Sequence, residues 1–249
     1  MSLLRVEGLS FAYPDEPLKN IFEDLTFTLE KGEIIAFIGH SGVGKTSLLN
    51  VLAGLKKPTM GSVYLNDLKE DELKGKISYM LQEDMLLPYY TVERNVALPY
   101  LIKKMKKKDA LEKIRPYFKE FKLDGYERAY PKKLSGGMRQ RAALMRTYFQ
   151  ENEVMLLDEP FSALDMITRD EMHKYFLEMR EKFKLSAILI THSIDEALTL
   201  ADKVYVLKNR PAKIFKEIKI DRGNLSRDEF LLSSEFLEYK KDIIESLQD

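Results

Sequence analysis

Residues 39–46 have the sequence Gly-His-Ser-Gly-Val-Gly-Lys-Thr, which matches the phosphate-loop pattern G-x-x-x-x-G-K-[ST] at every position. The apolar run Glu33–Ile38 before them is typical of a strand buried on both faces, and Thr46–Leu55 after them has a helical pattern. A strand, a glycine-rich loop and a helix in this order form the context that phosphate binding requires. The sequence therefore predicts a nucleotide-binding α/β protein, and the context disfavours a chance match in a turn.

The residue types of this loop suit a triphosphate. Glycine tolerates positive φ, so Gly39, Gly42 and Gly44 allow backbone N–H groups to converge on phosphate oxygens. The following helix directs its positive N-terminus at the same oxygens. Lys45 is expected to reach the β- and γ-phosphates, and Thr46 offers a hydroxyl ligand to Mg²⁺.

Two acids follow a second buried strand. The apolar run Val154–Leu157 ends in Asp158 and Glu159, and open α/β sheets bind ligands at the carboxyl ends of their strands. We expect Asp158 to hold Mg²⁺, directly or through water. Glu159 is expected to point to the other face and to polarise a water toward the γ-phosphate. The alternative is that both acids only end the strand before a turn at Pro160.

Further strands and helices alternate along the chain, which predicts a mainly parallel sheet with helices on both faces. The mostly helical pattern of residues 85–149 lies between two core strands and indicates an inserted lobe. The other predicted strands are Leu3–Leu9, Phe22–Leu29, Ser62–Leu65, Ile77–Met80 and Ala187–Ile190, with an edge hairpin at Val204–Leu207 and Ala212–Phe215. The other predicted helices are the amphipathic Asp165–Phe183 and the short Ile194–Leu200.

Composition excludes several classes of function. The 249 residues include no cysteine, which rules out disulfides, thiolate metal sites and a cysteine nucleophile. Lys+Arg and Asp+Glu are both 40, so there is no electrostatic footprint for nucleic acid, and the basic run Lys103–Lys108 is interpreted as a solvated helix face. Met1–Ser10 lacks a secretory signal, and no apolar run approaches the roughly 18 residues of a membrane span. We expect a soluble protein that reaches a membrane only through partners.

Over nearly its whole length the sequence resembles an ATP-binding-cassette (ABC) ATPase. Besides the phosphate loop and the carboxylate strand, the order of four more motifs and of one aromatic residue carries the resemblance. These are the Q-loop Gln82, the signature Leu134, Ser135, Gly136, Gly137 and Met138, the D-loop Ser162, Ala163, Leu164 and Asp165, the switch histidine His192, and the adenine-stacking aromatic Tyr13.

The resemblance implies a P-loop NTPase fold with an N-terminal antiparallel β-subdomain and an inserted helical subdomain. Applied to this chain, residues 1–84 and 150–220 form the core and β-subdomain, 85–149 the helical subdomain and 221–249 a helical tail. The implied activity is ATP hydrolysis with ATP and Mg²⁺. Two copies would pair head to tail as a homodimer, with each signature covering the ATP bound to its partner.

The resemblance also implies the roles of individual residues. The expected catalytic residues are Glu159, His192, Gln82 and Lys45. The expected metal ligands are Thr46, Gln82 and Asp158. The expected nucleotide contacts are Tyr13, Gly39, His40, Ser41, Gly42, Val43, Gly44, Lys45, Thr46 and Ser47.

One set of motifs without a membrane span is similar to a bacterial importer, whose ATPase and permease are separate chains. Residues 86–88 (Leu-Leu-Pro), 209–211 (Asn-Arg-Pro) and 236–238 (Phe-Leu-Glu) resemble the nitrate/sulfonate/taurine group, some members of which import thiamine-precursor pyrimidines. The implied partners are transmembrane permease subunits and, indirectly, an extracytoplasmic solute-binding protein, with no nucleic acid. The implied location is cytoplasmic, at the inner face of the cell membrane.

The alternatives to an importer ATPase are an exporter ATPase and a non-transport ABC ATPase. A P-loop kinase or GTPase belongs to another class and would leave the signature unexplained.

Several residues have a plainer interpretation. Ser135 precedes an apolar-periodic run and is expected to cap a helix N-terminus. Phe11 and Tyr13 alternate along a strand, so one would face the core and leave the other free to stack. His40 occupies a variable position of the phosphate loop and is interpreted as incidental, and His173 on the amphipathic helix is interpreted as solvated.

The sequence departs from the usual family pattern in two places. Residues 145–147 (Met-Arg-Thr) stand in the helix after the signature where Ala-Arg-Ala is common, and residues 152–153 (Asn-Glu) lack the common proline. Neither place contacts nucleotide in the family, so we expect these differences to affect local packing only.

Overall fold

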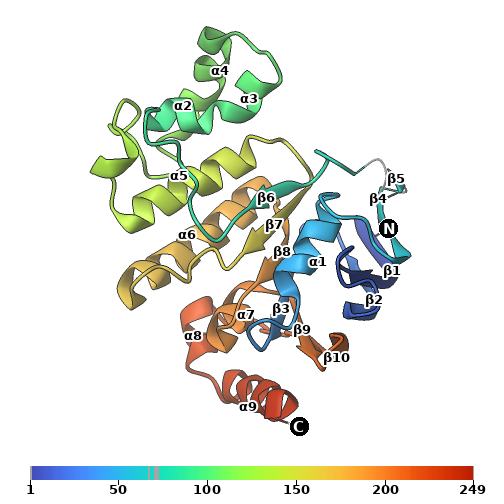
Figure 1. Ribbon diagram of the computed structural model, residues 1–249. Coiled ribbons are helices and arrows are strands. Elements are labelled where there is room, and N and C mark those ends of the chain that lie inside the picture. Colours follow the sequence, from blue (N-terminus) through green and yellow to red (C-terminus); the bar gives the residue numbers. More distant parts are fainter. Residues whose placement is uncertain (1, 67, 70–72, 249) are drawn as a thin grey trace.

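The computed structural model describes residues 2–66, 68–69 and 73–248, which form two sheets and the helices around them (Figure 1). The central sheet has six strands in the order β10-β9-β3-β8-β7-β6. Strands β9, β3, β8, β7 and β6 run parallel, and β10 pairs antiparallel with β9 at the edge. The bounds of these strands are β3 Ile34–Gly39, β6 Ser78–Met80, β7 Val154–Asp158, β8 Ser186–Ile190, β9 Lys203–Lys208 and β10 Lys213–Lys219. The predicted parallel sheet with an edge hairpin is therefore confirmed.

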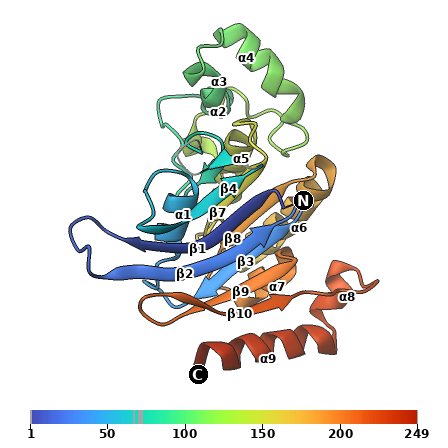
Figure 2. The ribbon, with the colours of Figure 1, turned by 90° about the vertical axis from the view of Figure 1, so that its right-hand side faces the viewer.

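A second sheet, in the order β2-β1-β4-β5, is antiparallel and contains most of the N-terminal segment. Its strands are β1 Leu4–Ala12, β2 Asn20–Leu29, β4 Met60–Leu65 and β5 Leu68–Lys69. Figure 2 shows β1 and β2 lying over strands of the central sheet. This sheet confirms the antiparallel β-subdomain that the family resemblance implies.

Two buried clusters cover opposite faces of the central sheet, because side chains alternate along each strand. In β3, Ile34 and Ala36 belong to one cluster, whereas Ile35 and Phe37 belong to the other. The first cluster packs under α5 (Gly136–Tyr148), α6 (Met166–Phe183) and α7 (Ile194–Leu200). The second lies between the two sheets and includes the buried leucines of α1 (Lys45–Leu52). Helices α1 and α5 therefore lie on opposite faces of the central sheet.

The short helices between β6 and α5 form a lobe at one end of the molecule (Figure 1). They are α2 Val92–Val96, α3 Leu98–Ile102 and α4 Lys107–Ile114, with 3-10 turns at Arg115–Tyr117 and Pro131–Lys133. Residues of this lobe share a buried cluster with α5 and the central sheet. The boundaries 85–149 for this lobe stay a prediction.

The C-terminal segment forms two helices, α8 (Arg227–Leu231) and α9 (Ser234–Gln248). Helix α9 runs beside β10 (Figure 2), where Lys216 and Asp242 form an ion pair at 2.5 Å. Within the described residues, no helix combines the length and apolar character needed to cross a bilayer.

Candidate nucleotide site

Four loops that carry predicted site residues meet at one edge of the central sheet. Strands β3, β6, β7 and β8 are mutually parallel, so their carboxyl ends point the same way. The phosphate loop follows β3, Gln82 follows β6, Glu159 follows β7 and His192 follows β8. Strand topology therefore gathers side chains that are up to 153 positions apart in the sequence (39 to 192).

The phosphate loop needs its glycines for two different reasons. Gly42 and Gly44 have φ of 73° and 111°, the left-handed region that glycine adopts without strain. A Cβ atom on Gly44 would also lie only 2.6 Å from Ile21 Cγ2. Gly39 does not have positive φ, but a Cβ there would lie 2.6 Å from the carbonyl oxygen of Leu207. The positive φ expected from the sequence thus applies to Gly42 and Gly44, and close packing explains Gly39.

Lys45 folds back over this loop. Its Nζ donates hydrogen bonds to the carbonyl oxygens of Gly39 at 2.7 Å and His40 at 3.1 Å. Burial lowers the pKa of Lys45, and the nearby carboxylates of Glu159 and Asp158 partly offset that effect. A cation held by carbonyl oxygens at a helix N-terminus can exchange them for phosphate oxygens, which form stronger charge-assisted hydrogen bonds.

Asp158 lies beside the first turn of α1. Its carboxylate accepts hydrogen bonds from Thr46 Oγ1 and from the Tyr79 hydroxyl, both at 3.4 Å. Burial raises the pKa of Asp158, and the hydrogen bond from Thr46 works against that rise. Tyr79 was not anticipated from the sequence, although it stands on the predicted strand Ile77–Met80.

The donor set around Asp158 fits Mg²⁺. The described residues contain no cluster of three His, Cys, Asp or Glu that could hold a metal by itself. Mg²⁺ bound with a nucleotide takes one or two protein ligands and completes its shell with phosphates and water. The adjacent Thr46 hydroxyl and Asp158 carboxylate match that requirement.

Glu159 joins three of the four loops. Its Oε2 accepts a hydrogen bond from Gln82 Nε2 at 3.2 Å and lies 3.2 Å from His192 Nδ1. Its own N–H donates to the carbonyl of Ile190 at 2.9 Å, which ties the end of β7 to β8. Glu159 has a φ of 45°, a strained value for a residue other than glycine that costs about 1–3 kcal/mol. Such strain is concentrated at functional sites, and here it directs the carboxylate toward Gln82 and His192.

Tyr13 borders the phosphate-loop helix. Its hydroxyl is 2.9 Å from Ser47 Oγ, and its side chain is 37% exposed. Phe11, two positions earlier on β1, is buried at 2%. The predicted alternation of these two rings is therefore confirmed, and stacking of Tyr13 on adenine stays a prediction.

The signature segment lies apart from the phosphate loop, at the start of α5. Ser135 caps this helix by accepting a hydrogen bond from the N–H of Met138 at 3.3 Å, as expected. A Cβ on Gly136 would contact Leu164 Cδ2 at 3.5 Å, and one on Gly137 would approach Thr168 Cγ2 to 2.7 Å. The signature of this chain thus packs against its own D-loop and the first turn of α6, on the sheet face opposite α1.

Comparison with known sequences places this arrangement in a family. Residues 22–162 match the profile described as ABC transporter. The chain belongs to the ABC transporter ATPases.

Related ABC proteins cover most of the chain. The formylaminopyrimidine import ATP-binding protein ThiZ of Halalkalibacterium halodurans is 40% identical over 218 residues, which are 88% of this chain and 84% of that protein. The aliphatic sulfonates import ATP-binding protein SsuB of Bacillus cereus is 36% identical over 228 residues, 92% of this chain and 88% of that protein. The predicted family and its ATP-hydrolysing activity are confirmed.

Solved structures agree with the fold. A dimeric ATP-binding cassette in a post-hydrolysis state with ADP and Pi is 25% identical, with a TM-score of 0.74, and the match covers 88% of this chain and all of that chain. The protein cbiO1 of Clostridium perfringens, part of the ABC transporter complex cbiONQ, has a TM-score of 0.79 at 22% identity, over 95% of this chain and 93% of that chain.

Two arginines of α5 in this ABC ATPase hold the segment after Gln82. Arg139 forms an ion pair with Asp84 at 3.0 Å. Arg146 donates to the backbone carbonyls of Met85 at 2.7 Å and Asp84 at 2.6 Å. Arg146 is the residue that this chain shares with the common Ala-Arg-Ala, whereas the two departures, Met145 and Thr147, are buried, with exposures of 0% and 1%. That these two departures affect only local packing stays a prediction. The seven-residue spacing of the two arginines on one helical face was an available signal for this anchor.

The expectation that His173 is solvated was wrong. His173 is 7% exposed, and its Nε2 lies 3.3 Å from Oε2 of Glu196. Helix α6 turns this position toward α7, a contact that periodicity within one helix does not reveal. His40 stands at the loop position taken as incidental, and its Nε2 lies 3.2 Å from the carbonyl oxygen of Leu247 in α9.

Proposed function

We propose that this ABC ATPase powers the import of a small solute, of the sulfonate or thiamine-precursor pyrimidine class, through separate membrane subunits. Support for import comes from ThiZ and SsuB, which are named as import ATP-binding proteins and align over most of the chain. The observation that carries the proposed mechanism is the convergence of Lys45, Asp158, Glu159 and His192 at one sheet edge.

Nucleotide binding uses the loop and its neighbours. The Lys45 ammonium and the backbone N–H groups of residues 39–46 bind the phosphates. Tyr13, with its partly exposed ring beside α1, stacks on the adenine. Thr46 and Asp158, with Gln82 at the same edge, would hold Mg²⁺, which supplies charge neutralisation for the phosphate oxygens.

Hydrolysis depends on Glu159. Its carboxylate orients a water toward the γ-phosphate and takes up a proton from that water. Gln82 and His192 flank the same carboxylate oxygen at 3.2 Å, so they hold it in the direction from which the water attacks. His192 also hydrogen-bonds the γ-phosphate and loses this contact when phosphate leaves. The loop after β8 that carries His192, here called the switch loop, therefore responds to hydrolysis.

The active form is a head-to-tail homodimer. Because α1 and α5 lie on opposite faces of the central sheet, the signature of one chain is directed away from its own phosphate loop. A second copy brings its signature to that loop and completes the site. The dimeric cassette with ADP and Pi has the same fold, which supports this arrangement.

The permease docks beside the Q-loop. Apolar side chains are exposed there, with Leu81 at 41%, Met85 at 50% and Leu87 at 39%. Arg146 ties the backbone of Met85 to α5, so movement of the lobe moves this surface. The chain would work at the inner face of the membrane, and a solute-binding protein would deliver cargo on the other side.

The substitution Glu159→Gln tests the mechanism. Loss of a general base lowers rates by about 10²–10⁴-fold, so turnover should fall by about 1000-fold while ATP binding stays within about twofold. Turnover is measured as phosphate release and binding by titration with a fluorescent ATP analogue.

The matched control is Glu153→Gln. Glu153 directly precedes the opposite end of β7 and pairs with Lys31 at 3.6 Å, so its loss should leave turnover unchanged. A Glu159→Gln protein that hydrolyses ATP at the rate of the unmodified chain refutes the role given to Glu159.

A further inference from the structure

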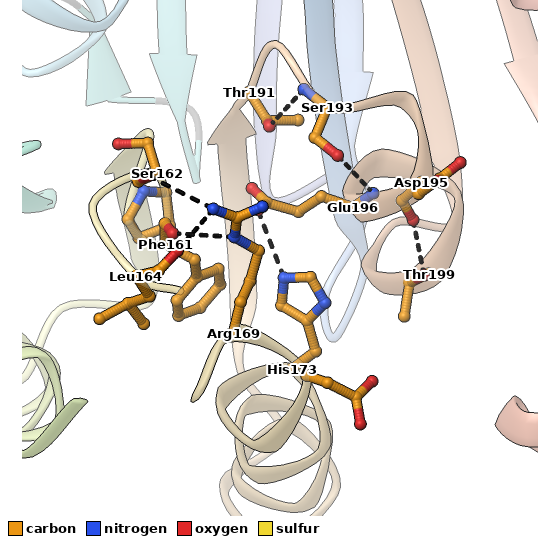
Figure 3. A network of polar contacts seen from close by, with 12 residues as sticks. Phe161, Ser162, Leu164, Arg169, His173, Thr191, Ser193, Asp195, Glu196 and Thr199 are labelled. Atoms are coloured by element: carbon orange, nitrogen blue, oxygen red, sulfur yellow. Dashed lines mark hydrogen bonds and ion pairs between the residues drawn. The ribbon is translucent and has the colours of Figure 1, made fainter. Parts of the chain in front are cut away.

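We infer that His173 and Glu196 are positioning residues that connect the D-loop to the switch loop behind the catalytic edge (Figure 3). Among the hydrogen bonds and ion pairs of the described residues, the side chains of His173 and Glu196 pair with each other and not with the phosphate loop or Glu159. They act through the D-loop and the switch loop. The inference rests on the proposed function, because that function gives His192 a contact with the γ-phosphate and gives the signature, which packs against the D-loop, a place on the partner's ATP.

Helix α6 holds the D-loop from below. Arg169, one turn into this helix, donates to the carbonyl oxygens of Leu164 at 2.6 Å and Phe161 at 3.2 Å (Figure 3). The ring of Phe161 packs edge-on against His173, with centroids 5.2 Å apart. Arg169 and His173 are four residues apart and therefore share one face of the helix. The position of this helix face therefore sets the position of the D-loop backbone.

Helix α7 holds the switch loop in a similar way. Ser193 caps the helix by accepting a hydrogen bond from the N–H of Glu196 at 3.3 Å, and its own N–H donates to Thr191 Oγ1 at 3.0 Å (Figure 3). His192 stands between these two residues. The position of the first turn of α7 therefore sets where the imidazole of His192 lies.

A buried polar contact joins the two helices at this level. His173 Nε2 and Glu196 Oε2 are 3.3 Å apart, and the two side chains are only 9% and 3% exposed. Oε1 of Glu196 is buried without a hydrogen-bond partner within the described part of the chain. Burying an unsatisfied polar atom costs about 1–3 kcal/mol.

Glu196 could satisfy its carboxylate within its own helix at a lower cost in free energy. A glutamate three residues after a serine N-cap ordinarily reaches back to the cap N–H in a capping box. Here Thr191 accepts from that N–H, and the carboxylate turns toward α6. Glu196 thus makes no capping-box hydrogen bond and pairs with His173 instead. This pairing joins the helices that carry the D-loop and the switch loop, so it is suited to position both loops.

The signature extends this connection. Gly137 approaches Thr168 in the first turn of α6, one position before Arg169. A partner nucleotide that shifts the signature would press on this turn, and the shift would reach His192 through His173 and Glu196.

The first test is His173→Phe in the full chain. Phenylalanine preserves the packing on Phe161 and removes the hydrogen bond to Glu196. We expect kcat for ATP to fall about tenfold, equal to about 1.4 kcal/mol in the barrier, with KM within twofold. His173→Gln, whose side-chain amide can still donate to Glu196, should keep at least half of kcat. A His173→Phe protein with unchanged kcat, or a glutamine variant as slow as the phenylalanine one, overturns the inference.

The control and a second variant separate positioning from stability. Arg180 pairs with Asp202 at 2.7 Å from the same helix, away from both loops, so Arg180→Gln should lower Tm and leave kcat unchanged. If His173→Phe fails to fold, the double variant His173→Phe/Glu196→Leu removes the unpaired carboxylate and must still show the tenfold lower kcat.

Failure of the proposed function and failure of this inference give different results. An unmodified chain without ATPase activity, or a Glu159→Gln chain with normal activity, refutes the proposed function. If both behave as expected and His173→Phe keeps its kcat, only this inference is refuted.

Discussion

The phosphate loop and the signature segment present the same local structure in different surroundings. Each is a glycine-containing start of a helix, the end of a helix that favours an anion. Around the phosphate loop stand Lys45 and the carboxylates of Asp158 and Glu159. The signature instead has its own hydroxyl cap, Ser135, and packs against the D-loop.

Because of this difference, the phosphate loop is a nearly complete anion site, whereas the signature supplies only part of one. A helix N-terminus alone stabilises an anion by about 0.3–1 kcal/mol, too little to hold a nucleotide. A lysine among converging N–H groups adds charge-assisted hydrogen bonds of about twice the usual strength. The phosphate loop therefore has the groups needed to bind ATP within one chain, whereas in the proposed homodimer the signature acts on ATP that the partner chain holds.

The largest effect is expected at the phosphate loop. Lys45→Ala removes the cation that bonds to Gly39 and His40, and loss of about 2.7 kcal/mol should weaken ATP binding about 100-fold. Titration with a fluorescent ATP analogue measures the change. Lys31→Ala, which alters an exposed lysine paired with Glu153, is the control and should bind normally. Binding by Lys45→Ala within twofold of the unmodified chain would contradict the assignment.

A smaller effect is expected at the signature. Gly136→Asp places a negative charge at the first residue of α5, where it favours the helix but repels the partner's phosphates. Turnover should fall about tenfold, while ATP binding by the single chain stays within twofold. Gly136→Ala is the neutral control, because its Cβ meets Leu164 at an ordinary 3.5 Å.

A mixture of the two variants tests whether the phosphate loop and the signature act across a dimer interface. A mixed dimer of Lys45→Ala and Gly136→Asp chains contains one intact site, made of the Gly136→Asp phosphate loop and the Lys45→Ala signature. Phosphate release should therefore exceed that of either variant alone. If the mixture is no more active than its components, the two segments do not act across a dimer interface.

The smallest expected effect concerns stability. Burial raises the pKa of Asp158 above the 3.8 of an ordinary aspartate, so the folded state binds its proton more tightly than the unfolded state does. The free energy of unfolding therefore decreases as pH rises from about 3.8 through the raised pKa, and stays lower at neutral pH.

Asp158→Asn should remove this penalty. At pH 7 we expect Tm without nucleotide to rise by about 2–4 °C, the shift that about 1 kcal/mol produces in a domain of this size. The same variant should lose the additional Tm increase that Mg²⁺ gives in the presence of ATP. Thermal melts at pH 7 and pH 4 check both points: a variant that melts at or below the unmodified chain at pH 7 would show that Asp158 stabilises the fold.

Much of this protein follows from its sequence. Residues 39–46 have a spacing that only a strand–loop–helix unit can use, and the apolar runs before Asp158 and His192 predicted the strands that deliver them. The patterns that indicate these features are local, because runs of apolar residues, glycines in a loop and helix-capping residues are read within a few positions. Ser135 as an N-cap and the alternation of Phe11 and Tyr13 were predictable for the same reason.

Contacts between separate elements depend on tertiary packing. The hydrogen bonds of Asp158 with Tyr79, of Arg146 with Met85, and of His173 with Glu196 join separate elements. Periodicity indicates which face of a helix is buried but not which residue of another element lies against that face. His173 was therefore misassigned, because only the packing of α6 on α7 makes an apparently free histidine a buried hydrogen-bond partner.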